Sequence, residues 1–149
     1  MQNLENKKRM ETWKIQSSDK KGFHKVITPD TCECQEAQMF RLNLPAGESY
    51  TLESKELELH PVLLAGKAKL SGHASLDQDM EKFDSCYIPG NDKLTITAKE
   101  DCIFYIAGAK YEGIGEPHFR KFDITLPIGD VHQIHGEGVG QREVMFTLA

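Results

Sequence analysis

The side chains best suited to metal chemistry stand near the end of the chain, where His132 and His135 are followed by Glu137. Imidazole nitrogens and a carboxylate oxygen are ligands that divalent transition metals accept. The two histidines are three residues apart, which is neither the His-x-His spacing of a strand nor the i, i+4 spacing of a helix. A shared face is therefore not guaranteed, and glycines at 136, 138 and 140 indicate a flexible connection. The segment is a candidate for an adventitious metal only.

A second set of positions follows a fixed spacing between two glycines. Gly47 is followed by five residues, then Glu53-Ser54-Lys55, three residues, Leu59, six residues and Gly66. This spacing resembles the first motif of cupin barrels, in which the three inner positions are the metal ligands His, His and Glu. The second cupin motif is matched in the same way, because Leu94 follows Pro89 by five residues, at the position of the fourth ligand.

The residues at these four positions are unsuited to holding a metal. Leu59 and Leu94 have no donor atom, and the ammonium group of Lys55 has no lone pair to offer. Glu53 alone supplies too few ligands. The sequence therefore predicts that the cupin-like site binds no metal and no other cofactor, and it assigns no catalytic residue.

Two interpretations of the interior remain open. Apolar side chains fill the barrel, or polar residues line a metal-free pocket that binds a substrate. The candidate substrate-binding residues are Arg41, Tyr50, His60 and Arg142, since guanidinium and hydroxyl groups donate hydrogen bonds to carboxylates and hydroxyls. His60 directly follows Leu59, so a straight strand would turn it to the opposite side.

Composition excludes some classes of protein. The chain has 149 residues, enough for one domain, with 23 acidic against 18 basic residues and no basic block. Nucleic-acid binding needs clustered Lys and Arg, so nucleic acid is not expected as a partner. No apolar run approaches the roughly 20 residues that span a bilayer. The N-terminus is polar and lacks the apolar core of a signal peptide. These features predict a cytoplasmic protein with no membrane partner.

The four cysteines agree with a reducing compartment. Cys32 and Cys34 flank Glu33 in a turn-like stretch, whereas Cys86 and Cys102 lie in apolar, strand-like runs. A structural zinc site usually has two pairs of ligands with short inner spacing, and no second pair is present. We expect all four thiols to be reduced.

Hydrophobic residues alternate with polar residues along most of the chain after Gly22, which predicts about ten short strands separated by Gly and Pro turns. The predicted strand residues include Phe40–Leu44, Leu94–Ala98, Cys102–Ala107, Phe122–Leu126 and Val144–Leu148. Only residues 74–82 and the N-terminal 20 residues or so have any helical character. This pattern is typical of an all-β sandwich, jelly roll or barrel. The cupin spacing selects a single jelly-roll cupin β-barrel, spanning residues 22–149, after a short N-terminal arm of residues 1–21.

Four segments resemble one particular family. The segment 135–144, in which a glycine-rich turn leads to Arg142-Glu143-Val144, is similar to the inter-domain segment of 5-deoxy-glucuronate isomerases. Those enzymes act in inositol breakdown and are related to 4-deoxy-5-hexosulose-uronate ketol-isomerases. Upstream, residues 40–49 resemble the family's strand and Ala-Gly-Glu turn, and residues 63–66 and 87–89 resemble its later strands. The resemblance covers about residues 22–149.

The resemblance implies that the two halves of such a protein have different roles. Members of the family have two cupin halves, and the metal and the ketol-isomerase chemistry belong to the second half. This chain resembles the first half, so the resemblance implies a cupin domain of carbohydrate catabolism that is not catalytic by itself. Arg142 would lie in the strand that joins the halves. The alternatives are a metal-independent cupin that binds a small sugar acid and a structural domain for oligomerisation. A terminal strand with an apolar face needs cover, which predicts a homodimer.

Overall fold

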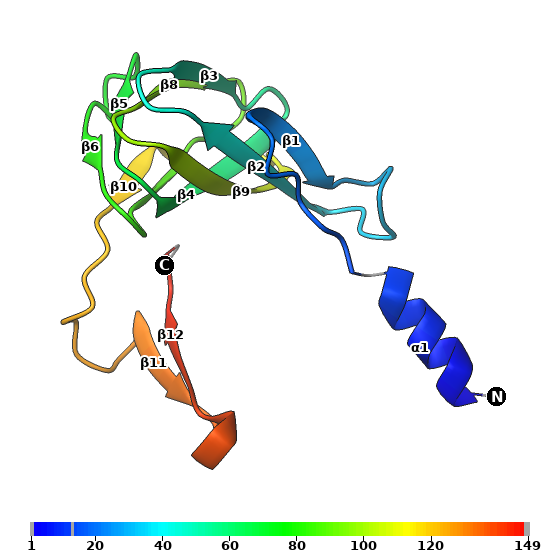
Figure 1. The fold of residues 1–149 in the computed structure, drawn as a ribbon. Coiled ribbons are helices and arrows are strands. Elements are labelled where there is room, and N and C mark those ends of the chain that lie inside the picture. Colours follow the sequence, from blue (N-terminus) through cyan, green and yellow to red (C-terminus); the bar gives the residue numbers. More distant parts are fainter. Residues whose placement is uncertain (1, 13, 148–149) are drawn as a thin grey trace.

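The computed structural model describes residues 2–12 and 14–147, and most of its regular structure is antiparallel β (Figure 1). In chain order the elements are α1 (Gln2–Thr12), β1 (Gly22–Ile27), β2 (Ala37–Leu44), β3 (Ser49–Glu53), β4 (Leu57–Ala65), β5 (Ala68–Ser71), β6 (Asp79–Met80), β7 (Ser85–Tyr87), β8 (Lys93–Ala98), β9 (Cys102–Lys110), β10 (His118–Arg120), β11 (His132–His135), the 3-10 helix Gly138–Gly140 and β12 (Arg142–Met145).

Two facing sheets make up the main body. The six-stranded sheet has the order β1-β2-β9-β4-β7-β10, and the four-stranded sheet has the order β3-β8-β5-β6. The strand pairings in both sheets are antiparallel. Within the described residues the sheets do not close into one continuous hydrogen-bonded barrel, because β1 and β3 each end a sheet. The predicted all-β jelly-roll architecture is confirmed.

Alternation along the strands explains the core between the sheets. Leu94, Ile96 and Ala98 are at most 2% exposed, while the threonines between them face outward. The predicted alternation of β8 is therefore confirmed, and β9 follows the same rule with Cys102, Phe104 and Ile106. Each fully buried Leu or Ile contributes roughly 1.5–3 kcal/mol of transfer free energy.

The glycines that bound the cupin spacing are required by the backbone. Gly47 and Gly66 both have φ of 83°, in the left-handed region that a side chain disfavours. A Cβ at Gly66 would also collide with the carbonyl group of Asp101. The spacing between the two glycines is thus a property of the fold, independent of any metal.

Two predictions of local structure are wrong. Residues 74–82 are not helical: Leu76 and Met80 are both buried at a helix-like spacing, but the chain between them turns and then pairs with β5. Residues 122–126 are not a strand, because Asp123 folds the chain into a turn by accepting hydrogen bonds from the amide and hydroxyl groups of Thr125 at 2.9 and 2.6 Å. The predicted terminal strand is shorter than expected, since β12 ends at Met145; Leu148 lies outside the described residues.

The cysteines lie where the sequence placed them. Cys86 and Cys102 are buried in strands, whereas Cys32 and Cys34 occupy the exposed loop before β2, and all four thiols are free. Burial raises the pKa of the Cys86 thiol to about 12. Cys86 is therefore protonated at neutral pH, which makes it an inert core residue.

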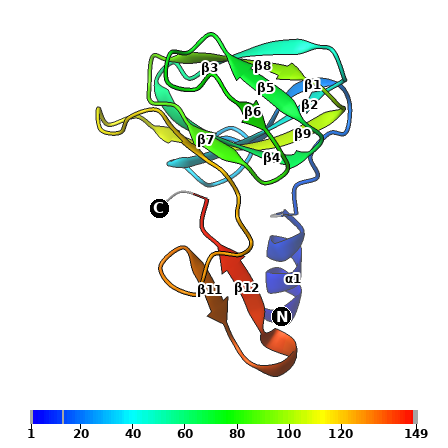
Figure 2. The ribbon, with the colours of Figure 1, turned by 90° about the vertical axis from the view of Figure 1, so that its left-hand side faces the viewer.

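The C-terminal hairpin is a sheet of its own. β11 pairs with β12 below the two main sheets (Figures 1 and 2), and Figure 1 shows this hairpin away from α1. His132 is buried in this hairpin, where its Nδ1 lies 2.7 Å from the Leu126 carbonyl oxygen and its Nε2 lies 2.6 Å from Oε1 of Glu143. A carbonyl oxygen and a carboxylate oxygen both accept, so this geometry favours the protonated, positively charged imidazole, in which both ring nitrogens donate.

The hairpin should therefore loosen as the pH rises. The hydrogen bond to Leu126 and the neighbouring Glu143 carboxylate raise the pKa of His132 above its ordinary value of about 6.5. A raised pKa contributes stability that is complete below about pH 6.5 and is lost as the pH rises through the folded-state value. NMR titration of the His132 ring and amide-exchange protection factors of residues 132–145 measure both effects.

The matched control is His135→Gln, because His135 is exposed on the same strand and its ring hydrogen-bonds to the Gln133 side chain. This change should leave the pH dependence intact, whereas Glu143→Gln should lower the pKa of His132. A His132 pKa below 6.5, or protection that grows with pH, would contradict the charged interaction.

Candidate functional site

The four positions equivalent to cupin metal ligands do not converge. Leu59 and Leu94 are 3% and 0% exposed and belong to the apolar core, whereas Glu53 and Lys55 are exposed at its rim. Hydrocarbon side chains offer no lone pair, so this donor set does not fit a metal. In the described part of the chain, no group of three or more His, Cys, Asp or Glu side chains is arranged to hold a metal ion.

An open hollow of about 360 Å³ lies beside these positions, between the edge strands β1 and β3. Aromatic and aliphatic side chains form its floor, and polar side chains surround it. The lining residues are Phe23, Lys25, Gln38, Phe40, Tyr50, Thr51, Leu52, Glu53, Ser54, Lys55, Glu56, Leu57 and Leu59.

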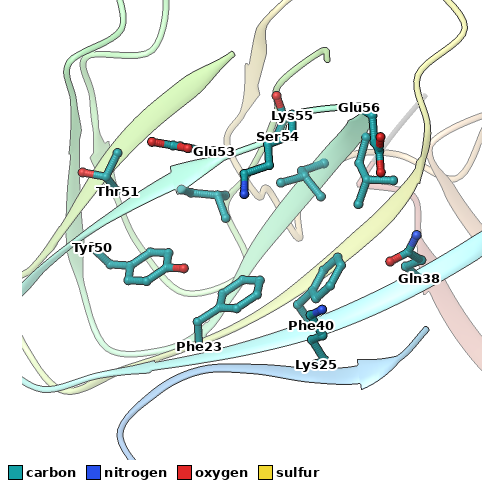
Figure 3. A pocket seen from close by; sticks show the side chains of 13 residues that line it. Phe23, Lys25, Gln38, Phe40, Tyr50, Thr51, Glu53, Ser54, Lys55 and Glu56 are labelled. Carbon is teal, nitrogen blue, oxygen red and sulfur yellow. The ribbon is translucent and has the colours of Figure 1, made fainter. Parts of the chain in front are cut away.

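Three stacked rings form the aromatic part of this hollow. Phe23 lies 5.1 Å from Phe40 and 5.5 Å from Tyr50 between ring centroids, with interplanar angles of 25° and 3°. Phe23 is on β1 and Tyr50 is on β3, so the stack joins the open edges of the two sheets. Figure 3 shows the rings side by side, with Lys55 reaching toward them from the opposite side. Ring pairs of this kind contribute about 0.5–1.5 kcal/mol beyond their buried area.

The turn that presents Lys55 is held by the second cupin motif. The Ser54 amide donates to the carbonyl oxygen of Asp92 at 2.9 Å, and the Asp92 amide donates to Oγ of Ser54 at 2.8 Å. The amide of Asn91 donates to the carbonyl of Lys55 at 2.5 Å. The Asp92 carboxylate accepts in turn from Nε2 of His73 at 2.9 Å. The two motifs of the spacing therefore hold each other in place, and the contribution of His73 was not predicted from the sequence.

Of the four predicted substrate-binding residues, Tyr50 alone lines this hollow. Burial, with a smaller effect of the Glu53 carboxylate, raises the pKa of the Tyr50 phenol. The hydroxyl is therefore a hydrogen-bond donor at neutral pH. Lys25 and Gln38, which were not among the predicted binding residues, share the hollow with it. Their position was readable from alternation, because they lie two residues from Phe23 and Phe40 on the same strand faces.

Arg41 lies on the outer face of the six-stranded sheet. It donates to Oγ of Ser17 at 2.9 Å and to Oδ1 of Asn43 at 2.8 Å, and its guanidinium is 5.9 Å from the centroid of the Tyr105 ring. Asn43 donates to the carbonyls of Ser18 and Lys20. These contacts fasten the segment before β1 to the sheet, so the Arg41 side chain already has a structural role.

His60 also points away from the core, as its position next to the buried Leu59 predicts. It lines a smaller hollow of about 160 Å³ with Tyr87 and Ala107. Burial lowers the pKa of His60, although a hydrogen bond to the Thr147 backbone acts in the opposite direction. Its buried Nε2 has no hydrogen-bond partner among the described residues.

Arg142 and the hairpin histidines lie away from the hollow. Arg142 is exposed on β12, opposite His135 in the hairpin register. His132 uses both ring nitrogens in hydrogen bonds, and the spacing of three residues along a strand turns His135 to the other face. The structure therefore does not bring His132 and His135 together as a metal site. It separates Arg41, Tyr50, His60 and Arg142 into four places, and their roles in binding stay predictions.

No helix in residues 2–12 and 14–147 is long and apolar enough to cross a membrane.

Comparisons with known proteins identify the relatives of this chain. A model of the KduI/IolB family matches residues 12–145. An IolB-like protein from Salmonella typhimurium LT2 has a similar structure, with a TM-score of 0.72 and 21% identity, over 90% of this chain and 53% of that protein. This chain therefore spans about half the length of that relative. No curated protein matched the chain.

More distant structures share the fold. An RmlC-like cupin with a double-stranded β-helix from Methanocaldococcus jannaschii has a TM-score of 0.54 at 16% identity, over 66% of this chain and 90% of that one. The Cnp3 cupin domain of Schizosaccharomyces pombe has a TM-score of 0.50 at 21% identity, over 59% of each chain. These neighbours confirm the cupin fold, and the family match over most of the chain shows that the protein belongs to the KduI/IolB family.

Proposed function

We propose that this chain is a non-catalytic cupin domain in the isomerisation of a deoxy-uronate sugar acid. Membership of the KduI/IolB family supports the reaction class, since the resemblance implies 5-deoxy-glucuronate or a related ketol-isomerase substrate. The domain supplies a folded support, and a second cupin unit supplies the chemistry. The chain covers 53% of the IolB-like protein, which leaves room in such a relative for a unit of that kind.

The observation that carries this proposal is the packing of Leu59 and Leu94. Aldose–ketose isomerisation needs a base that moves a proton, or a metal that polarises the carbonyl for hydride transfer. At the cupin ligand positions the chain has two core leucines, one exposed lysine and one exposed glutamate. The buried part of the site is hydrocarbon, which supplies neither a base nor a ligand.

The hollow between the edge strands β1 and β3 favours a second role. It has an aromatic floor and a polar rim, and its volume of about 360 Å³ is in the range of about 300–1,000 Å³ of small-molecule sites. We therefore also propose that the domain binds a small sugar acid without a metal.

The first role predicts that the purified chain does not isomerise 5-deoxy-glucuronate, with or without added Mn²⁺, Zn²⁺, Fe²⁺ or Ni²⁺. The reason is the absence of a base or ligand at the buried positions described above. A coupled or NMR assay of ketose formation measures the outcome.

Turnover by the unmodified chain would contradict this proposal. If turnover disappeared in His132→Gln together with His135→Gln, the active site would lie in the hairpin. If it disappeared in Glu53→Gln, the active site would lie at the cupin position.

We further propose that the chain forms a homodimer through its C-terminal hairpin. Ile134 and Phe146 are 45% and 40% exposed there, and Val139 is fully exposed at the tip. Both outer edges of this two-stranded sheet are unpaired in the described structure, which favours association. Sedimentation equilibrium at micromolar concentration should give the mass of two chains, and Ile134→Glu should reduce it to one.

Ile114→Glu is the matched control, because Ile114 is 81% exposed but lies outside the hairpin. This variant should remain dimeric. The mass of a single chain for the unmodified protein would refute the dimer, and dissociation by Ile114→Glu but not by Ile134→Glu would move the interface elsewhere.

A further inference from the structure

Cys32 and Cys34 lie outside both the hollow and the apolar core. They belong to the loop 28–36 between β1 and β2, which projects beyond the ends of these strands (Figure 1). Cys34 is exposed and Cys32 is partly exposed, whereas the other two thiols, Cys86 and Cys102, are buried. A small molecule in solution can therefore reach this pair of sulfurs and is excluded from the other two.

The two side chains are held next to each other. The Cys34 amide donates a hydrogen bond to Sγ of Cys32, with 3.3 Å between nitrogen and sulfur. The Cys34 thiol also hydrogen-bonds to the Cys32 side chain, and this bond is the main cause that raises the pKa of Cys34 above its ordinary value. Cys32 is therefore the acceptor of the pair and Cys34 the donor. Because the attacking form of a cysteine is the thiolate, which accepts hydrogen bonds, this polarity suits Cys32 to attack and Cys34 to keep its proton.

Hydrogen bonds on the N-terminal side of the loop fix the position of Cys32. The amides of Thr31 and Cys32 donate to the Thr28 carbonyl oxygen at 2.9 and 3.2 Å, and the Thr28 amide donates to Oγ1 of Thr31 at 2.8 Å. Thr28 is only 5% exposed, so this turn is anchored to the body of the protein. Cys34 follows the turn, and its sulfur can approach Cys32 without moving the anchored part.

We propose that this pair is a thiol–disulfide exchange site for small-molecule disulfides, with Cys32 as the attacking sulfur and Cys34 as the resolving sulfur. The Cys32 thiolate attacks one sulfur of the substrate, which breaks its S–S bond and releases a thiol. Cys34 then loses its proton and attacks the Cys32 sulfur of the mixed disulfide, which forms the Cys32–Cys34 bond and releases the second thiol. The protein loses two electrons and two protons, and the substrate gains them as two thiols.

The oxidised pair should be easily reduced again. A ring closed across one intervening residue removes little entropy from the unfolded chain, and an exposed disulfide is accessible to thiols. The pair therefore suits reversible exchange more than structural stabilisation. This proposal is independent of the functions proposed above, because none of the residues that line the hollow belongs to the loop 28–36.

Treatment of the full chain with glutathione disulfide, followed by mass spectrometry of the quenched protein, tests the site. We expect a transient adduct of one glutathione and then a chain lower in mass by two hydrogen atoms, with the new bond between Cys32 and Cys34 in a peptide map. Excess reduced glutathione should restore both thiols. No reaction at millimolar glutathione disulfide, a lasting adduct on the unmodified chain, or a disulfide that joins two chains would overturn the proposal.

Three variants test the assigned roles. Cys34→Ser should stop at a mixed disulfide on Cys32, because the resolving sulfur is missing. Cys32→Ser should form its adduct on Cys34 at least about threefold more slowly, the effect of roughly one hydrogen bond. Thr31→Val removes the hydroxyl that accepts from the Thr28 amide, so ring closure should slow by a similar factor while adduct formation continues. Equal adduct rates in the two serine variants would overturn the assignment of attacking and resolving sulfurs.

Cys102→Ser is the matched control, because a hydroxyl there can still donate to the carbonyl oxygens of Lys67 and Glu100 that the thiol contacts. This variant should exchange at the rate of the parent chain. Ring closure that is unchanged in Thr31→Val would show that any exposed Cys-x-Cys segment reacts in this way, and it would refute a site positioned by the fold.

Discussion

The hydrocarbon packing between the two sheets is the constraint on which the rest of this structure depends. Protein interiors are filled at nearly crystalline density, so a side chain that enters the core excludes whatever else would occupy its place. Leu59 from β4 and Leu94 from β8 enter the core from opposite sheets and are almost completely buried. Two positions that hold metal ligands in other cupins are occupied here by leucines, and the packing of these leucines helps to hold the two sheets together.

Because apolar side chains fill the interior, the polar side chains near the motif lie at the open edge between the two sheets. Charged side chains near the motif lie at the rim, where Lys55 remains in water and the stack of Phe23 with Tyr50 closes the floor. The same stack bridges β1 and β3, the two strands at which the sheets fail to join. The gap in the barrel and the candidate ligand site are therefore the same feature.

The fold was predictable because it depends on local alternation and on turn residues. The alternation of β8 and the glycines at 47 and 66 are visible in the sequence, and the structure has them where the pattern places them. The run of β9 is apolar throughout, so its alternating burial is visible only in the structure. Residues 122–126 were not predictable in this way. The amide of Phe122 donates to the buried Asp84 carboxylate, a contact across 38 residues that no local pattern contains.

The site was only partly predictable, for a related reason. Chemical type alone selected Arg41, Tyr50, His60 and Arg142, whereas strand parity decides which of them face the interior. Arg41 alternates with Phe40 and Leu42, so its outward direction was readable, and the same rule would have selected Lys25 and Gln38. The joining of β1 to β3 through three rings depends on the packing of the two sheets, which the sequence does not display.

The central claim, that leucine packing has replaced the metal of this cupin, is tested most directly by thermal unfolding with parallel elemental analysis. The chain is purified without a chelator and then unfolded with and without EDTA. We expect less than a tenth of an equivalent of any transition metal, as an order-of-magnitude bound for a site without ligands, and the same melting temperature in both conditions. One equivalent of Zn, Mn, Fe or Ni, with a lower melting temperature in EDTA and loss of both effects in Glu53→Gln, would contradict the account.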